Sequence, residues 1–271
     1  MTFLLRRLWR FLQSVWLVAL MLVIWELATR AANDAIFPPP SKIVPALHTL
    51  WFNGPASHLF LNSDALDDFS SSLGHVFAAW LISGVLGLSL GFVIGRSQLI
   101  SDLLDPILQF VRALPAPALI PFFLVVFHGG ASLQIAVITF GVVWPILLSA
   151  VDGVRGVDPL HLDTAEVFGI GRTRRTLSII LPGALPKIFA GLRVSLEFAL
   201  ILMVIAELVD STSGIGARML SAERDFTFTT VWSGIVILGL LGLLFNGVFL
   251  RIQRHYLSWH TGARRHDPSE I

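Results

Sequence analysis

The chain contains no cysteine, only two lysines and few charges of either sign for its 271 residues. Without thiols it can form neither disulfide bonds nor thiolate metal sites. Neither Lys42 nor Lys187 lies in a G-x-x-x-x-G-K-[ST] phosphate loop, so we expect no ATP hydrolysis by this chain alone. The eight histidines have no metal-ligand spacing, and no nucleophile triad or catalytic carboxylate pair indicates an enzyme. A formal net charge of +1 argues against nucleic acid as a partner.

Apolar side chains dominate the sequence instead. They make up 55% of the residues, and charged residues make up only 14%, against about 25% in a typical soluble domain. A soluble fold of this size could not bury so much apolar surface, so the membrane is the simpler solvent. Because a helix needs about 20 apolar residues to cross the hydrocarbon core, the sequence predicts an all-α membrane protein with six transmembrane helices. They occupy roughly residues 14–32, 73–95, 107–127, 132–151, 186–208 and 229–250.

Two of these segments carry signals that compete with a simple span. The first follows three arginines within the first ten residues, as a cleaved signal peptide would, but its apolar run is long for one. The third carries Pro115, Pro117 and Pro121. Each proline removes a backbone donor and can kink a helix, although neighbouring helices can compensate inside a bundle.

The distribution of positive charge predicts the orientation. If the six segments alternate, 15 of the 19 lysines and arginines lie on the side of the N-terminus and four on the other. Both ends should therefore be cytoplasmic, as residues 1–13 and 251–271, on either side of a transmembrane domain at 14–250. The loop at 152–185 is then cytoplasmic as well.

Two further features allow two readings each. Residues 41–52 have helical spacing and follow three consecutive prolines, so they could form an outer lip for a partner or a helix that covers the bundle. In the second span, small residues recur every four positions, which lets helix backbones approach closely in lipid. The resulting seam could lie within the subunit or across a dimer. Its members are Ser83, Gly87, Gly91 and Gly95.

One polar segment interrupts the apolar sequence between the fourth and fifth helices. Asp158 can cap a helix and Pro159 suits its first position, while Gly169 suits a left-handed turn that ends it. A second start signal follows two to four residues later, and the pair Leu181 and Pro182 closes the segment. The pattern predicts two short helices joined by a glycine bend. Such a knob could fit a groove in a soluble partner, or it could be an ordinary cytoplasmic loop.

The same segment resembles the EAA loop of ABC importer permeases of the binding-protein-dependent type. That pattern has Glu-Ala-Ala, three residues, a glycine, nine less constrained positions and Ile-x-Leu-Pro. The matching residues here are Asp163, Thr164, Ala165, Gly169, Ile179, Leu181 and Pro182. Aspartate in place of glutamate and threonine in place of the first alanine depart from the pattern, while the spacing is kept.

Other motifs resemble the nitrate, sulfonate and taurine branch of these permeases, and the likeness extends from about residue 20 to 260. They are PGALPKIFAGLRVSL from residue 182, Ala206-Glu207-Leu208, Gly214-Ile215-Gly216, and the runs FPPPSKIV and RALPAPALIPF. The resemblance implies a type I ABC importer-like fold in a bacterial inner membrane.

The resemblance also implies a set of partners. Two copies of the permease, in a homodimer, would form the pathway within the lipid bilayer. Two cytoplasmic ATPase subunits would hold ATP and Mg²⁺, and this chain itself would carry no cofactor. An external solute-binding protein would deliver the substrate. The implied ATPase-coupling residues are Leu160, His161, Asp163, Thr164, Ala165, Gly169, Arg172, Leu181 and Pro182.

The substrate implied by the branch is a small organic or inorganic anion, such as a sulfonate, taurine or nitrate. A pyrimidine thiamine precursor or an aromatic acid is the alternative. The alternative function classes are an ion-coupled secondary transporter and a membrane scaffold without transport. Neither class accounts for the spacing around Gly169 and Pro182.

Ionisable residues in or near the predicted spans are candidates for the pathway, because such groups are costly in lipid and often functional. Glu197 lies four residues after Arg193 and can pair with it on one helix face. Glu207, near the outer end of the fifth span, could shape the pathway or close an outer gate. An acidic group is a poor ligand for an anion, so we favour the gate. Arg112 could attract anions or anchor the third helix at the headgroups.

Overall fold

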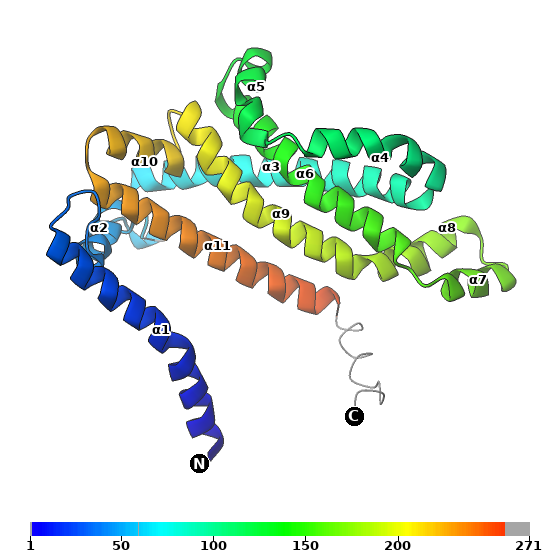
Figure 1. Cartoon of the computed structure of the whole chain (residues 1–271), viewed down its shortest axis with the longest axis horizontal. Helices are drawn as coiled ribbons and strands as arrows, with labels where there is room; N and C mark the ends of the chain where they lie inside the picture. Colours follow the sequence, from blue (N-terminus) through cyan, green and yellow to red (C-terminus); the bar gives the residue numbers. More distant parts are fainter. Residues whose placement is uncertain (1, 59, 258–271) are drawn as a thin grey trace.

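The computed structural model describes residues 2–58 and 60–257, with side chains described from residue 16 onward. Within these ranges all regular secondary structure is helical (Figure 1). The long helices are α1 (Thr2–Ala32), α3 (Ser63–Arg96), α6 (Gly130–Arg155), α9 (Leu181–Val209) and α11 (Phe228–Tyr256). The shorter ones are α2 (Pro40–Trp51), η1 (Ala56–His58), α4 (Gln98–Arg112), η2 (Ala116–Leu119), α5 (Ile120–Phe127), α7 (Pro159–Val167), α8 (Arg172–Arg175), η3 (Thr176–Ile180) and α10 (Ile215–Arg224).

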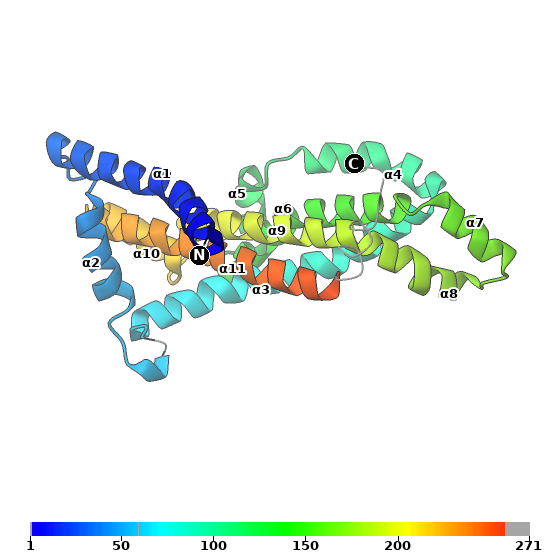
Figure 2. The same cartoon turned by 90° about the horizontal axis from the view of Figure 1, so that it is seen from below.

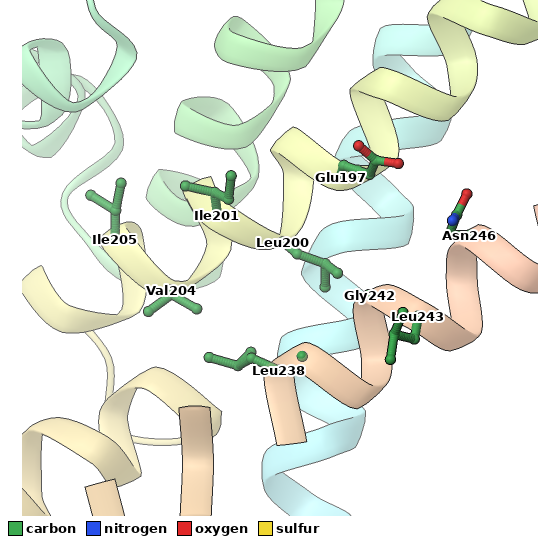
Figure 3. Close-up of a pocket in the computed structure, with 10 residues that line it drawn as sticks. Glu197, Leu200, Ile201, Val204, Ile205, Leu238, Gly242, Leu243 and Asn246 are labelled. Atoms are coloured by element: carbon green, nitrogen blue, oxygen red, sulfur yellow. The ribbon is translucent and has the colours of Figure 1, made fainter. Parts of the chain in front are cut away.

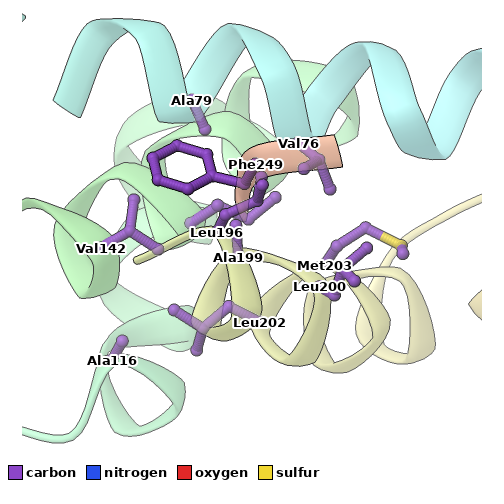
Figure 4. Close-up of a cluster of buried hydrophobic side chains, with 11 residues drawn as sticks. Val76, Ala79, Ala116, Val142, Leu196, Ala199, Leu200, Leu202, Met203 and Phe249 are labelled. Carbon is purple, nitrogen blue, oxygen red and sulfur yellow. The ribbon is translucent and has the colours of Figure 1, made fainter. Parts of the chain in front are cut away.

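The core of the bundle is formed by α3, α6 and α9, which run side by side in both views (Figures 1 and 2). Their facing side chains are small or aliphatic, so the helices pack closely around one apolar cluster (Figure 4). That cluster also receives Ala116 from η2 and Phe249 from α11. Its other members are Val76, Ala79, Ile138, Val142, Leu196, Ala199, Leu200, Leu202 and Met203.

Four helical runs among the described residues are long and apolar enough to cross a membrane. They contain the predicted spans at 73–95, 132–151, 186–208 and 229–250. The bent pair of α4 with η2 and α5 would make a fifth. The first predicted span, 14–32, lies in α1, and most of its apolar side chains from Trp16 onward are exposed. A count of six spans therefore still depends on α1 and remains a prediction.

The third predicted span, 107–127, is not one straight helix. Its first part belongs to α4, which ends at Arg112, and the chain then turns by 81° into η2 and α5. The prolines explain the break: Pro115 precedes η2, and Pro117 and Pro121 each lie at the first positions of a new helix. At these positions the missing backbone N–H carries no cost, whereas inside one continuous helix it would.

The seam of small residues in α3 lies within the subunit. Gly91 leaves room for the backbone of α6, because a Cβ atom there would lie 2.6 Å from the carbonyl oxygen of Leu147. Gly87 approaches Ile146 in the same way, and the Ser83 hydroxyl donates to the carbonyl of Thr139 at 3.2 Å. The spacing thus serves close packing between α3 and α6.

The segment 41–52 covers the bundle rather than standing free. It forms α2, which packs against α11 and buries Trp51 completely. The indole Nε1 of Trp51 donates to the hydroxyl of Ser233 at 3.0 Å, and the guanidinium of Arg218 lies 5.0 Å from its ring centroid. Of the two readings of the sequence, these contacts favour the covering helix.

Candidate functional site

The polar segment between α6 and α9 forms a knob at one end of the molecule (Figure 1). Asp158 caps α7, because its carboxylate accepts a hydrogen bond from the backbone N–H of Leu160 at 2.9 Å. Pro159 occupies the first helical position, where its lack of an N–H is harmless. Both features agree with the sequence prediction.

Gly169 ends α7 in a left-handed turn, with φ at +63°. The N–H of Ile170 donates to the carbonyl of Ala165, and the N–H of Gly169 donates to that of Glu166, both at 2.9 Å. These two bonds form a Schellman motif, which satisfies carbonyls that the helix end would otherwise leave free. A glycine is favoured here because a side chain at positive φ is strained.

The second half of the knob differs from the prediction. Leu181 and Pro182 do not close a separate short helix, because α8, η3 and α9 continue one another without a break from residue 172 to 209. The segment Thr176–Ile180 is a π-helix, placed directly before Pro182. A proline cannot donate to the preceding turn and clashes with it, and a wider turn relieves both problems. The knob is thereby an extension of the transmembrane helix α9.

The knob is tied to the bundle at several points. Ala165 is buried, and Leu162 packs on a cluster that includes Val154 of α6 and Ile180. An ion pair of 3.3 Å joins the Arg175 guanidinium to the Glu166 carboxylate, across the turn between α7 and α8. The guanidinium of Arg96, at the end of α3, donates to the Thr176 hydroxyl at 2.5 Å. A force on α7 would therefore reach α3, α6 and α9 together.

The free side of the knob presents apolar side chains to solvent. Leu160, Val167, Phe168 and Leu177 are 60–86% exposed. Isolated apolar residues are ordinary on a surface, but a group gathered on a polar knob indicates a contact site. Sequence reasoning included Leu160 and missed the other three. Two of the missed residues, Val167 and Phe168, could have been recognised in the sequence as an apolar pair directly before Gly169.

The other predicted coupling residues lie on the same knob. His161, Asp163, Thr164, Gly169 and Arg172 are exposed, whereas Ala165 is buried. Leu181 and Pro182 are half-buried where η3 meets α9. A shallow groove between α7 and this junction is bordered by His161, Thr164, Phe168, Ile179 and Pro182, among others.

A second polar cluster lies at the opposite end of α9, where Glu207 is completely buried. One oxygen of its carboxylate accepts from the Ser72 hydroxyl of α3 and the other from the backbone N–H of Gly216 in α10, both at 2.7 Å. A Cβ atom on Gly214 would lie 2.6 Å from the carboxyl carbon of Glu207. The Ala-Glu-Leu and Gly-Ile-Gly motifs are therefore in direct contact.

Asp68 of α3 completes this cluster. Its carboxylate accepts from the N–H of Gly214 at 2.9 Å and pairs with the guanidinium of Arg218. The Ser72 hydroxyl accepts from the N–H of Ile215 at 2.9 Å. Three consecutive N–H groups at the start of α10 thus donate to side-chain oxygens of α3 and α9. The start of a helix leaves such N–H groups without partners in the helix and carries a partial positive charge, so carboxylates stabilise it. Nothing in the sequence pattern paired Asp68 or Ser72 with Glu207.

The remaining candidates do not join either cluster. Glu197 pairs with Arg193 one turn away at 3.6 Å, as predicted, and both side chains are partly exposed. With Asn246 it marks one end of an otherwise mostly apolar groove between α9 and α11 (Figure 3). Arg112 is exposed at the end of α4. Among the residues described, no group of three or more His, Asp or Glu is placed to hold a metal ion.

The knob and the buried cluster are connected by a single helix. Leu181 and Glu207 are 26 residues apart on α9, or about 39 Å at 1.5 Å per residue. This is more than the thickness of a hydrocarbon core of about 30 Å. Helix α9 is therefore long enough to place the knob and the polar cluster on opposite sides of a membrane.

Comparison with known proteins gives this arrangement a context. The chain is 29% identical over 245 residues to the taurine transport system permease protein TauC of Escherichia coli (strain K12), covering 90% of this chain and 88% of that protein. It is 28% identical over 258 residues to the putative aliphatic sulfonates transport permease protein SsuC of Bacillus subtilis (strain 168), covering 94% and 90%.

A solved structure shares the fold. The methionine ABC transporter MetNI, in an inward-facing conformation, contains a chain that aligns with a TM-score of 0.63 at 18% identity, covering 70% of this chain and 94% of that one. The sequence profile described as "Binding-protein-dependent transport system inner membrane component" matches residues 83–258. The chain therefore belongs to this family and is a non-catalytic permease subunit of an ABC importer, with the type I fold.

Proposed function

We propose that this permease imports a small anion and that its cytoplasmic ATPase drives it through the knob of α7 and α8. The observation that carries the proposal is the exposed apolar surface of the knob, on a support tied to three transmembrane helices. A partner that binds Phe168 and its neighbours in one state more tightly than in the other would bias the helices between two conformations.

The partners follow from this scheme. Two ATPase subunits bind the knobs of two permease copies, and they carry the ATP and Mg²⁺. A homodimer of this chain, surrounded by lipid, encloses the pathway, and an external solute-binding protein delivers the substrate. The excess of arginine on the side of the knob supports a cytoplasmic location for both chain ends.

The substrate class rests on the relatives. TauC is named for taurine transport and SsuC for aliphatic sulfonates. We infer that this chain carries a small sulfonate or a similar anion such as nitrate. The inference is compatible with Glu207 as part of a gate, because its carboxylate oxygens accept hydrogen bonds from Ser72 and Gly216 rather than facing a ligand. Glu197, beside the groove of α9 and α11, is retained as a pathway candidate.

The ATPase contact can be tested by replacing Phe168 with aspartate. Burying a phenylalanine contributes about 1.5–3 kcal/mol, and a charge placed in the same contact adds a desolvation cost. We expect the amount of ATPase that co-purifies with the detergent-solubilised chain to fall more than tenfold, as measured by quantitative mass spectrometry. Phe226→Asp is the matched control, because Phe226 is 80% exposed and Phe168 is 78% exposed. Phe226 lies between α10 and α11, whereas Phe168 follows α7, which is at the other end of the molecule (Figure 1). Equal ATPase recovery with both variants would contradict the proposed docking surface.

The gate can be tested with Glu207→Gln. Glutamine keeps one acceptor oxygen for the N–H of Gly216, but its amide nitrogen cannot accept the proton of Ser72. Losing one buried hydrogen bond costs about 1–3 kcal/mol, so the complex should assemble while its outer end opens more readily. We expect faster ATP hydrolysis without substrate, by about threefold or more, and weaker coupling to transport in proteoliposomes. Wild-type transport and basal ATPase at all substrate concentrations would remove Glu207 from the mechanism.

A further inference from the structure

Helix α4 carries a polar face that belongs neither to the knob nor to the buried polar cluster around Glu207. Five of its six polar residues recur at alternating spacings of four and three, which places them on one side of an α-helix, and the sixth, Ser101, is buried. All five are exposed. They are Gln98, Asp102, Asp105, Gln109 and Arg112.

The other two faces of α4 are apolar. One packs on α3 and α6, through Leu104 and Leu108 against a cluster around Leu147. The second is exposed, and it includes Leu103 and Phe110, which are 71% and 69% accessible. A helix with two exposed faces of opposite character meets two different solvents. The apolar face suits lipid, so the polar face requires water or polar partners.

The polar face extends deep into the bundle. In both overall views α4 lies alongside α3 and α6 (Figures 1 and 2). Just beyond Arg112, the side chain of Ala116 lies 3.3 Å from the position of a Cβ atom built on Gly141. Gly141 is 14 residues from the end of α6 at Arg155, or about 21 Å along the helix. We infer from this spacing that Arg112 lies deeper in the membrane than the inner end of the third span, where the sequence prediction placed it.

The acidic residues on this face have hydrogen-bond partners within α4, whereas its one arginine has no ion-pair partner among the described residues. Asp102 accepts a hydrogen bond from Gln98 at 2.8 Å, and Asp105 accepts one from Gln109 at 3.1 Å. Arg112 makes no ion pair with any carboxylate among the described residues. The two carboxylates lie on the knob side of Arg112, so an anion that leaves the arginine toward the cytoplasm meets no second cation on this face.

We propose that the polar face of α4 lines the inner half of the translocation pathway and that Arg112, at the break between α4 and η2, contacts the passing anion. The proposal rests on the proposed function and adds the position of a substrate contact. The guanidinium suits a sulfonate or nitrate because it presents several N–H donors in one plane to an oxyanion. A pathway contact must hold the anion long enough to select it and still release it.

The absence of native cysteine allows a direct test in inside-out membrane vesicles that contain the whole transporter. Single cysteines are introduced by Gln109→Cys on the polar face and by Phe110→Cys on the apolar face at the same depth. Their rates of reaction with hydrophilic thiosulfonate reagents are then compared. We expect Gln109→Cys to react at least tenfold faster. Equally slow reaction at both positions would overturn the proposed lining.

The contact with an anion is tested on the Gln109→Cys background, one helical turn from Arg112. The rate with an anionic thiosulfonate is divided by the rate with a cationic one, and Arg112→Gln is expected to lower this ratio at least threefold. Arg112→Lys should preserve it, because lysine keeps the charge. A ratio unchanged in Arg112→Gln would overturn the contact. Recovery of the ATPase from the same vesicles tests the proposed function separately, since labelling does not depend on ATP.

Discussion

Replacing Gly169 with valine is expected to leave the permease folded and to reduce substrate-stimulated ATP hydrolysis about tenfold. Gly169 has a φ of +63°, and among the described residues no atom beyond its chain neighbours lies within 4 Å of a Cβ built there. The effect of a side chain is therefore strain in the backbone and not a clash. A residue other than glycine in this region costs about 1–2 kcal/mol, and a β-branched one is worse. The turn that orients Phe168 would open, and the ATPase would lose its rigid contact.

Two controls separate this strain from a general effect of substitution. Gly169→Asn keeps a left-handed conformation at little cost, because asparagine tolerates it, and it should retain at least half of the stimulated activity. Gly171→Ala changes a nearby glycine whose φ is −58° and which has equally open surroundings, and it should act as the wild type does. The measurement is ATPase activity in proteoliposomes with saturating binding protein and substrate. Full stimulation in Gly169→Val would show that the turn plays no part in coupling.

The parts of the knob that could be predicted from the sequence depend on neighbouring residues only. Asp158, Pro159 and Gly169 act on helix ends within a few positions of themselves, so their residue types are sufficient signals. The continuation of the helix through Pro182 could not be predicted in this way. It requires a π-helical turn, and that turn is held by contacts of Ile180 and Thr176 with other helices.

The candidate site beyond the knob shows the same division. Glu207 could be chosen because an acid near the end of an apolar span is unusual. Its partner Ser72 is 135 residues away in the chain, and no local pattern relates the two. Likewise, three prolines predicted a disturbed third span, but the depth that we infer for Arg112 rests only on the packing of Ala116 beside Gly141. Tertiary contacts decide both features, and a single sequence does not record them.

The small-residue seam gives the second prediction, which concerns folding. Replacing Gly91 with leucine should prevent close packing of α3 on α6. Even the Cβ atom would lie 2.6 Å from the carbonyl oxygen of Leu147 and 2.7 Å from the Cβ of Ala150. The first of these atoms belongs to a helix backbone and cannot move aside alone. Overpacking of a well-packed core costs typically about 1–3 kcal/mol, and separation of two central helices should exceed this.

Gly84→Leu provides a control that makes the same chemical change in the same helix. Outside its own stretch of helix, a Cβ atom at Gly84 meets no atom of the described residues within 4 Å, so this variant should gain apolar surface without a clash. We expect normal yield and thermal stability for Gly84→Leu in detergent, and loss of most folded protein for Gly91→Leu, as measured by fluorescence-detected size exclusion. Comparable stability of the two variants would mean that α3 and α6 are not held at this distance. The knob would then lack the rigid support on which coupling to the ATPase depends.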